Sequence, residues 1–434
     1  MYKIFVRAKK DHDALQATIN KFFKDWPIEI HTFKGYRTPG RVFEILESSV
    51  DEEHYNIVLL GREDSTLASL QKYFRENTIF YVIDYTRVRN ARIWHIAQAF
   101  DNARALIRNT VGWNGRSYVF SHIGETFLRI DLPAADLFLG IGKGFTSLLK
   151  RYIRVELVTP LFLRLLGGEH RIFQGASLVA VLRIPDRGEV EVLREPDKTD
   201  YIVVKPNQLV EDNFRIIKLH ERIALNLIKR NVEGDVIVPW SGGRDSTAVL
   251  LLTVKALGSK HVKAVYVDTG VDFDHEKYLQ YVSSKLGVKL YRVRALVKEK
   301  LKDQGLPTHD NRWCTVLKIQ ALHNKIREVA GEKATIIVGD RDAESRPRSR
   351  RPPVRFENSF RVIAPIKNWS TALTQLYLLA NKIPLNSLYY MGFYRMGCYI
   401  CPALRSWELE ILKDMKELYN KPFFKDFLRS RGLN

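Results

Sequence analysis

The segment with the strongest chemical character is the loop Ser-Gly-Gly-Arg-Asp-Ser at residues 241–246. Residues 236–240 before it predict a buried strand, and residues 247–257 after it predict a helix. A loop between a strand and a helix points free backbone N–H groups at an anion, because glycines allow close approach and the helix dipole adds positive charge. Three hydroxyl groups add further donors: Ser241, Ser246 and Thr247. The loop is therefore predicted to bind the phosphate or sulfate group of a ligand.

The chain contains only three cysteines, Cys314, Cys398 and Cys401. Three are too few for a disulfide framework in 434 residues, so metal or redox chemistry is expected. Cys398 and Cys401 form a C-x-x-C pair, and Cys314 lies at the start of a predicted helix. The residues alone leave three alternatives: a metal such as zinc with one outside ligand, a dithiol redox pair with Cys314 inert, and purely structural thiols.

The overall charge also bears on the kind of partner. The formal net charge is +20 and the estimated pI is 9.7, which predicts a field that attracts polyanions such as RNA or a phosphorylated nucleotide. The alternative is a surface rich in solvated ion pairs, as thermophiles favour. The sequence has neither an apolar run of about 18 residues nor a signal-peptide pattern. We therefore expect a cytoplasmic protein that does not bind a membrane.

The elements that must position these residues predict an α/β protein in three parts. Residues 1–150, with alternating short strands and helices and a helix at 91–112, predict an N-terminal α/β accessory domain. Residues 151–212 predict a β-rich accessory domain, because their apolar residues recur with a period of two. Its strands are expected at residues 152–158, 177–184, 190–195 and 201–206, with a turn at 195–200. Residues 213–434 are the predicted catalytic domain.

The β-rich part also resembles a known class of RNA-binding domain. Its order of strands and residues 165–181 (LLGGEHRIFQGASLVAV) are similar to PUA-type domains. The resemblance implies an RNA contact, and a β linker domain without a ligand is the alternative.

Residues 241–246 resemble the PP-loop of the adenine nucleotide α-hydrolase superfamily. The resemblance implies that the loop binds a pyrophosphate, sulfate or phosphate, and that ATP, where it is the substrate, is cleaved at its α-phosphate. It implies nucleotide contacts from seven residues: Ser241, Gly242, Gly243, Arg244, Asp245, Ser246 and Thr247. Asp245 would act in catalysis by helping to place the phosphate or Mg²⁺. Its alternative role is that of a charge stabilised by the helix dipole, worth about 0.3 to 1 kcal/mol.

Later segments are similar to phosphoadenosine phosphosulfate (PAPS) reductases, and this resemblance covers about residues 213–410. It implies a doubly wound, mainly parallel sheet. Asp268, Thr269 and Gly270 match a D-T-G motif at the end of a strand, where open α/β sheets bind ligands. Asp268 would contact the ribose or the base of the nucleotide, unless it only stabilises a turn.

A second motif of these reductases, G-x-R-x-x-E-S-x-x-R, matches residues 339–348. The match places Gly339, Arg341 and Arg348 at the nucleotide, with the two arginines as predicted phosphate contacts. Six arginines between positions 341 and 355 make this segment an anion-binding surface.

The cysteines match the family only in part. Iron-sulfur members carry a Cys-Cys pair at the helix start, where this chain has Trp313 and Cys314, and add a distant C-x-x-C. Cys314, Cys398 and Cys401 would then hold a 4Fe-4S cluster with one open iron, which resembles the clusters of some tRNA-thiolating enzymes. Thiol-dependent PAPS reductases need a cysteine in a C-terminal E-C-G-x-H segment, and no cysteine follows Cys401.

These resemblances imply three functions. The first is ATP-dependent adenylation of RNA, with tRNA as the expected partner, followed by sulfur transfer from a donor that the sequence does not identify. The second is reduction of PAPS or adenosine phosphosulfate. The third is nonenzymatic binding of RNA or nucleotide. Whether the chain forms a homodimer is left open.

Overall fold

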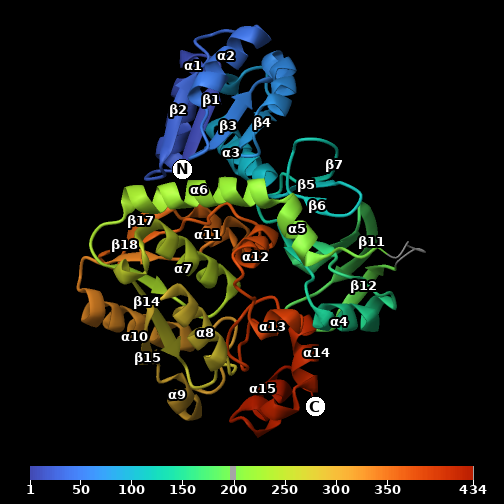
Figure 1. Cartoon of the computed structure of the whole chain (residues 1–434), viewed down its shortest axis with the longest axis vertical. Coiled ribbons are helices and arrows are strands. Elements are labelled where there is room, and N and C mark those ends of the chain that lie inside the picture. Colours follow the sequence, from blue (N-terminus) through green and yellow to red (C-terminus); the bar gives the residue numbers. More distant parts are fainter. Residues whose placement is uncertain (196–201, 434) are drawn as a thin grey trace.

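The computed structural model describes residues 1–195 and 202–433 as an α/β protein with four sheets. A parallel N-terminal sheet lies at one end, two antiparallel sheets lie to one side, and a six-stranded sheet lies at the other end (Figure 1). Among the helices described, none combines the length and the apolar character needed to cross a membrane. The predicted α/β fold class, with α/β and β-rich accessory parts before a mainly parallel sheet, is confirmed.

The N-terminal unit is a four-stranded parallel sheet in the order β2-β1-β3-β4. Its strands are β1 (Tyr2–Val6), β2 (Ile28–Thr32), β3 (Tyr55–Leu60) and β4 (Thr78–Val82). One face is covered by α1 (Lys9–Phe22) and α3 (Ile93–Arg108), the other by α2 (Pro39–Ser49) and the 3-10 segment η1 (Arg62–Tyr73). Both faces are buried because neighbouring side chains of a strand point to opposite sides, as Ile4 and Phe5 do.

Two antiparallel sheets follow the N-terminal unit. Together with α4 they form the β-rich part of the structure, residues 110–194, which begins before the expected start at residue 151. The smaller contains β5 (Thr110–Trp113), β6 (Tyr118–Val119) and β7 (Thr126–Arg129). The larger contains β8 (Asp136–Leu139), β9 (Leu161–Arg164), β10 (Glu169–Gln174), β11 (Ser177–Arg183) and β12 (Glu191–Arg194), paired in chain order. Helix α4 (Lys143–Ile153) packs against the larger sheet.

The structure of this region differs from the sequence-based expectations at several positions. The strand predicted at 152–158 is wrong, because α4 continues through Ile153, whose side chain is buried, and ends at Arg154 in the left-handed conformation. Of the strand predicted at 201–206, Val203 forms one isolated bridge, to Val158. Residues 196–201, which include most of the predicted turn, lie outside the described residues. The domain boundary predicted at residue 150 falls within α4. Strand β8, before this boundary, pairs with β9, after it.

The C-terminal sheet has six strands in the order β15-β14-β13-β16-β18-β17, all parallel except β17. The strands are β13 (Val236–Pro239), β14 (Val262–Asp268), β15 (Lys289–Arg294), β16 (Thr335–Ile337), β17 (Val354–Glu357) and β18 (Phe360–Ile363). Chain order reverses between β13 and β16. Ligands of open α/β sheets bind at such a reversal, beyond the carboxyl ends of the strands.

Helices cover both faces of this sheet. On one face lies α10 (Trp313–Ala330); on the other lie α6 (Phe214–Asn231), α7 (Arg244–Leu257), α8 (Glu276–Leu286) and α12 (Thr371–Ala380). The shorter helices are α5 (Pro206–Asp212), α9 (Val297–Gln304), α11 (Arg346–Arg350), α13 (Ser387–Tyr390), α14 (Ser406–Asp414) and α15 (Phe424–Ser430).

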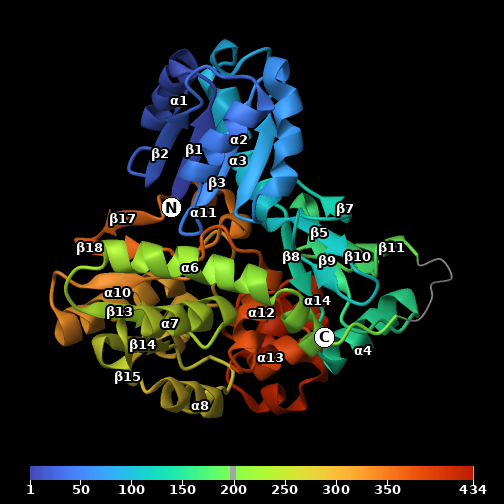
Figure 2. The same ribbon diagram turned by 45° about the horizontal axis from the view of Figure 1, so that its top comes forward.

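Helix α6 lies between the N-terminal unit and the C-terminal sheet, as Figure 2 shows. The Nδ1 atom of its buried His220 lies 2.8 Å from the hydroxyl oxygen of Tyr55 in β3. Arg222 of α6 forms an ion pair with Glu52 of the N-terminal unit. The two α/β units are thus joined by specific polar contacts as well as by apolar packing.

A buried charge network makes a second connection between the units. Asp342, which follows β16, lies 2.6 Å from Arg104 of α3 and 3.0 Å from Lys367. Arg108 approaches the same carboxylate to 3.9 Å. All four side chains are buried, so each charge depends on the others for its solvation.

Replacing Asp342 with asparagine is expected to destabilise the protein by about 3 to 5 kcal/mol, because three buried cations lose their shared carboxylate. The midpoint of urea unfolding measures this loss. The control is Asp13→Asn, whose side chain is 61% exposed and whose unfolding midpoint should stay near that of the wild type. Equal midpoints for all three proteins would show that the network does not stabilise the fold.

Candidate functional site

The serine-glycine loop joins β13 to α7 at the carboxyl edge of the C-terminal sheet. Trp240 fixes its first end: the backbone N–H donates to Val265 O at 2.9 Å, and the indole Nε1–H donates to Thr247 Oγ1 at 2.9 Å. Gly242 has a φ of +75°, which glycine adopts without steric cost. The predicted strand, tight loop and helix are therefore present at this position.

Several backbone donors of the loop face no acceptor. Within the described residues, the N–H groups of Gly242, Asp245 and Ser246 have no hydrogen-bond partner. Arg244 N–H donates to the hydroxyl oxygen of Tyr389 at 3.1 Å. Unpaired N–H groups at the start of a 14-residue helix form an anion-binding arrangement. Thr247, predicted to contact the nucleotide, is instead fully buried as the acceptor of Trp240.

The predicted Gly339 supports the loop through its lack of a side chain. It follows β16, and a Cβ at this position would lie 3.0 Å from the backbone carbonyl carbon of Asp245. The end of β16 and the first turn of α7 can approach this closely only because residue 339 is glycine.

The loop opens into a cavity of about 740 Å³. Its walls include Ser241, Gly243 and Ser246 from the loop and Asp136, Phe138, Arg164 and Asp186 from the β-rich accessory part. The accessory part therefore contributes directly to the site, which the analysis of single motifs in the sequence did not predict.

Arg341 joins the loop to the accessory part. Its Nε–H donates to Asp245 Oδ1 at 2.9 Å, and Nη1 donates to Asp136 Oδ2 at 3.1 Å. Asp136, the first residue of β8, also accepts from the backbone N–H of Thr371 at 2.9 Å. Arg341 is only 2% exposed. The arginine predicted as a phosphate contact thus lies between two carboxylates.

Other cations line the cavity at its surface. Arg348 pairs with Glu344 and lies 3.7 Å from Asp340, with its side chain 42% exposed. The guanidinium of Arg312 has no hydrogen bond or ion pair among the described residues, and that of Arg395 has one hydrogen bond there, to Cys401 Sγ at 3.7 Å. Neither arginine belongs to a motif that the sequence singled out. Both flank cysteines in the sequence, and this was the signal that could have identified them.

The D-T-G motif lies beside this cavity, in a separate hollow of about 430 Å³. Asp268 accepts from Gly270 N–H at 2.7 Å and pairs with Arg294 at 2.6 Å. Thr269 is buried, and its Oγ1 lies 3.4 Å from Cys398 Sγ. The motif therefore connects the edge of the sheet to the cysteines.

A third cavity, of about 320 Å³, lies between β14 and α10. It shares Ser241 and Met396 with the loop cavity, and most of its other lining is apolar, including Trp240 and Leu322. Its volume is at the lower end of the range for small-molecule pockets. An apolar ring attached to a group held by the loop would fit here.

The structure brings the three predicted cysteines to one region, next to Lys318. Cys398 Sγ donates to Asp272 Oδ1 at 3.4 Å. Burial, followed by the charge of Asp272, raises the pKa of Cys398 to about 12. Burial and then Cys401 raise the pKa of Cys314. Burial alone would lower the pKa of Lys318, but Asp272 and the three thiols raise it above its usual value.

This arrangement does not match a metal centre. Among the described residues, no group of three or more His, Cys, Asp or Glu side chains is placed to hold a metal ion. Cys398 is instead a protonated thiol that donates to a carboxylate. The predicted iron-sulfur or zinc ligand set therefore does not fit the residues as they are placed.

Asp136 should give stability a measurable pH dependence. Burial alone would raise its pKa, but Arg341 and Arg164 lower it to about 2. Because the folded-state pKa is depressed, the stabilisation, about 2 kcal/mol, is complete above pH 4 and is lost as the pH falls through 2. The difference in thermal midpoint between wild type and Asp136→Asn should shrink between pH 4 and pH 2. Asp84→Asn, at a side chain 93% exposed, is the control. A difference that stays constant would contradict the assigned pKa.

The chain is similar to several known proteins. An uncharacterized protein of Methanocaldococcus jannaschii is 35% identical over 230 residues, which are 51% of this chain and 46% of that protein. The chain thus spans about half the length of this relative. Adenosine 5'-phosphosulfate reductase of Chelativorans sp. is 27% identical over 172 residues, 39% of this chain and 69% of that enzyme.

Among solved structures, the U34-tRNA thiolase NcsA from Methanococcus maripaludis aligns with a TM-score of 0.32 and 13% identity, covering 55% of this chain and 85% of that one. The family model described as the phosphoadenosine phosphosulfate reductase domain matches residues 235–404. This span contains the loop, the D-T-G motif and the C-x-x-C pair. Residues 235–404 of the chain are therefore similar to the phosphoadenosine phosphosulfate reductase domain, as the sequence motifs predicted.

Proposed function

We propose that the chain is an adenine-nucleotide-dependent enzyme that adenylates a carbonyl oxygen of an RNA base and then replaces that oxygen with sulfur. The observation that carries the proposal is the composition of the loop cavity. One wall is the loop with its unpaired N–H groups, and the opposite wall comes from the β-rich accessory part. A site built from two domains accommodates a nucleotide and a second, larger substrate.

The nucleotide is held by the PP-loop at residues 241–246. The N–H groups of Gly242, Asp245 and Ser246 bind the phosphates of ATP, and the adjoining apolar cavity receives the adenine. Asp245 cannot reach freely toward Mg²⁺, because Arg341 holds its carboxylate. In this proposal Asp245 is a positioning residue, and the Mg²⁺ expected from the sequence enters bound to ATP.

Adenylation makes the oxygen of the base a good leaving group. The base oxygen attacks the α-phosphorus, a new oxygen–phosphorus bond forms, and pyrophosphate leaves when the α–β phosphoanhydride bond breaks. Arg312 and Arg395 are the accessible cations of the cavity that stabilise this charge. A donor of sulfide-level sulfur then attacks the carbon, and AMP departs with the oxygen.

In this proposal the sulfur donor acts beside the cysteines. Gly397, next to Cys398, lines the apolar cavity together with Asp272 and Lys318. Arg395 lies between this region and the loop cavity, 3.7 Å from Cys401 Sγ. We assign Cys401 to positioning that donor through its S–H group, because Cys398 is held as a protonated thiol by burial and Asp272. An iron-sulfur cluster at these thiols would require the side chains to rearrange.

The RNA acceptor is supported by charge and by architecture. The formal net charge is +20, and the accessory parts contribute Phe138 and Arg164 to the loop cavity. A reductase that acts on a free sulfonucleotide has no need of a second domain in the wall of its site. The expected tRNA partner and the PUA-like role of the β-rich part belong to this proposal.

The second candidate is reduction of adenosine phosphosulfate or PAPS. The likeness to an adenosine 5'-phosphosulfate reductase over 172 residues favours it. The same loop would bind the sulfate end of the nucleotide, and the thiols would supply electrons.

Two assays distinguish these candidates. The first measures AMP released from ATP with and without bulk tRNA and sulfide, and the second measures sulfite released from adenosine phosphosulfate or PAPS with a dithiol. RNA-dependent AMP release with incorporation of sulfur into the RNA is the expected result. Sulfite release without AMP release would overturn the proposal in favour of the reductase, and absence of both activities would indicate a nonenzymatic binding protein.

Gly242→Ala is expected to lower ATP affinity at least about tenfold, because a side chain at φ +75° displaces the N–H groups that bind the phosphates. Gly35→Ala is the matched control: it has φ +88°, but its added methyl group meets no atom within 4 Å and lies in the N-terminal unit. Isothermal titration calorimetry with ATP measures the affinity of each variant. Unchanged affinity in Gly242→Ala would contradict the assignment of the loop.

A further inference from the structure

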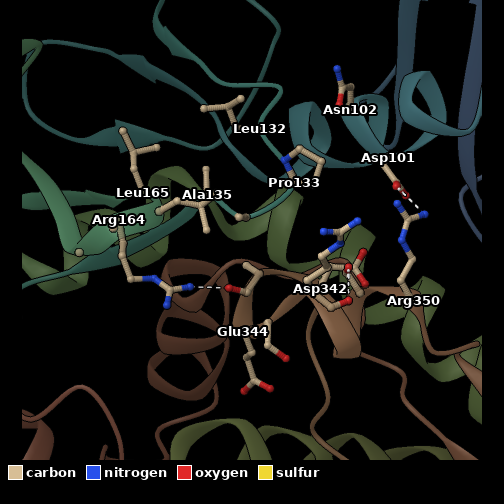
Figure 3. Close-up of a pocket in the computed structure, with 18 of the residues that line it drawn as sticks. Asp101, Asn102, Leu132, Pro133, Ala135, Arg164, Leu165, Asp342, Glu344 and Arg350 are labelled. Atoms are coloured by element: carbon tan, nitrogen blue, oxygen red, sulfur yellow. Dashed lines mark hydrogen bonds and ion pairs between the residues drawn. The ribbon is translucent and has the colours of Figure 1, made fainter. Parts of the chain in front are cut away.

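A cavity of about 1040 Å³, larger than the loop cavity, lies between the accessory parts and the arginine-rich segment 341–351. In Figure 3, Asp101 and Asn102 approach it from α3, Leu132, Pro133 and Leu165 from the β-rich part, and Asp342, Glu344 and Arg350 from the opposite side. The motifs in the sequence did not indicate it, because its lining comes from segments far apart in the chain.

One wall carries large apolar side chains that are open to solvent. Trp94 of α3 is 51% exposed, Leu132 is 52% exposed and Leu166 is 79% exposed. Arg92 lies over the Trp94 ring, with its guanidinium carbon 5.2 Å from the ring centroid. An exposed indole beside a guanidinium is a stacking surface for a planar ring such as a nucleobase.

The opposite wall offers positive charge. All four carboxylates that line the cavity already have cationic partners: Asp101 with Arg104 and Arg350, Asp186 with Arg405, Asp342 with Arg104, and Glu344 with Arg348. Arg346 is exposed on α11, and its guanidinium has no hydrogen bond or ion pair among the described residues. Arg346 is therefore free to bind a phosphate, and the paired carboxylates repel that phosphate only weakly.

The cavity leads to the PP-loop. Five residues line both it and the loop cavity: Arg164, Asp186, Glu344, Ser345 and Arg405. A chain that enters beside Trp94 can therefore reach the phosphate-binding loop without leaving the protein surface.

We infer that this cavity binds an unpaired segment of the RNA acceptor next to the reacting nucleotide. A base stacks on Trp94, the leucines contact neighbouring apolar surface, and Arg346 binds the backbone phosphate. Unpaired rather than duplex RNA fits, because stacking on an indole requires a base removed from its helix. The inference rests on the proposed RNA acceptor and adds the place where that RNA is held.

The test uses the full chain and three RNA probes: bulk tRNA, a single-stranded octamer that carries 2-aminopurine, and a blunt duplex of equal length. Trp94→Ala should weaken octamer binding roughly 5- to 100-fold, the range for loss of one stacked base, and should abolish the quenching of 2-aminopurine fluorescence. Trp94→Phe should restore most of the binding. Arg346→Gln should weaken binding of all single strands. It should also lower the magnitude of the slope of log affinity against log salt concentration by about one.

Two controls match these variants. Tyr73→Ala removes an aromatic side chain that is 62% exposed outside the cavity, and Arg41→Gln removes an arginine that is 67% exposed on α2. Neither should alter RNA binding. Because Trp94 and Arg346 are both exposed, their variants are expected to fold, and ATP affinity at the loop should remain unchanged in both.

The outcomes separate this inference from the proposed function. If wild type binds tRNA and releases AMP but the Trp94 and Arg346 variants bind the octamer as tightly, the cavity assignment is wrong and the proposed function stands. If wild type binds no RNA and releases no AMP, the cavity assignment and the proposed function are both wrong. Equal affinity for duplex and octamer would also overturn the inference, since stacking requires an unpaired base.

Discussion

The site depends on one buried guanidinium shared by two carboxylates. Arg341 holds Asp245, which belongs to the PP-loop and to the first turn of α7, and Asp136, the first residue of the large antiparallel sheet. A buried arginine without both partners would lose its solvation at a cost of several kcal/mol. The position of the accessory sheet and the shape of the phosphate-binding loop are therefore fixed by the same interaction.

The cations of the molecule include one group that is buried and another that is exposed at the cavities. Arg104, Arg108 and Lys367 surround Asp342 in the interior, where they connect the N-terminal unit to the C-terminal sheet. Arg312 and Arg346 lie at cavity surfaces and have no ion-pair partner among the described residues. The excess of positive charge in the sequence is thus partly buried in ion pairs and partly exposed at the cavities.

The two large cavities share Arg164, Glu344 and Arg405, so the reacting centre and the adjoining surface form one continuous region. Both cavities are lined by Arg164 of the β-rich part and by Glu344, which follows β16. An open α/β sheet supplies the phosphate-binding edge by its topology, and the added domain closes that edge on one side.

The sequence by itself determined the local part of this result. Strand, loop and helix around residues 236–257 were predictable because glycine spacing and apolar periodicity act over a few residues. The roles of Arg341 and Thr247 were not predictable, because each is decided by a partner that folding brings near: Asp136 for the arginine and Trp240 for the threonine. Tertiary structure alone decided which charges are buried and which cavities form, since both depend on contacts between segments more than 100 residues apart, such as the 205 residues that separate Arg341 from Asp136.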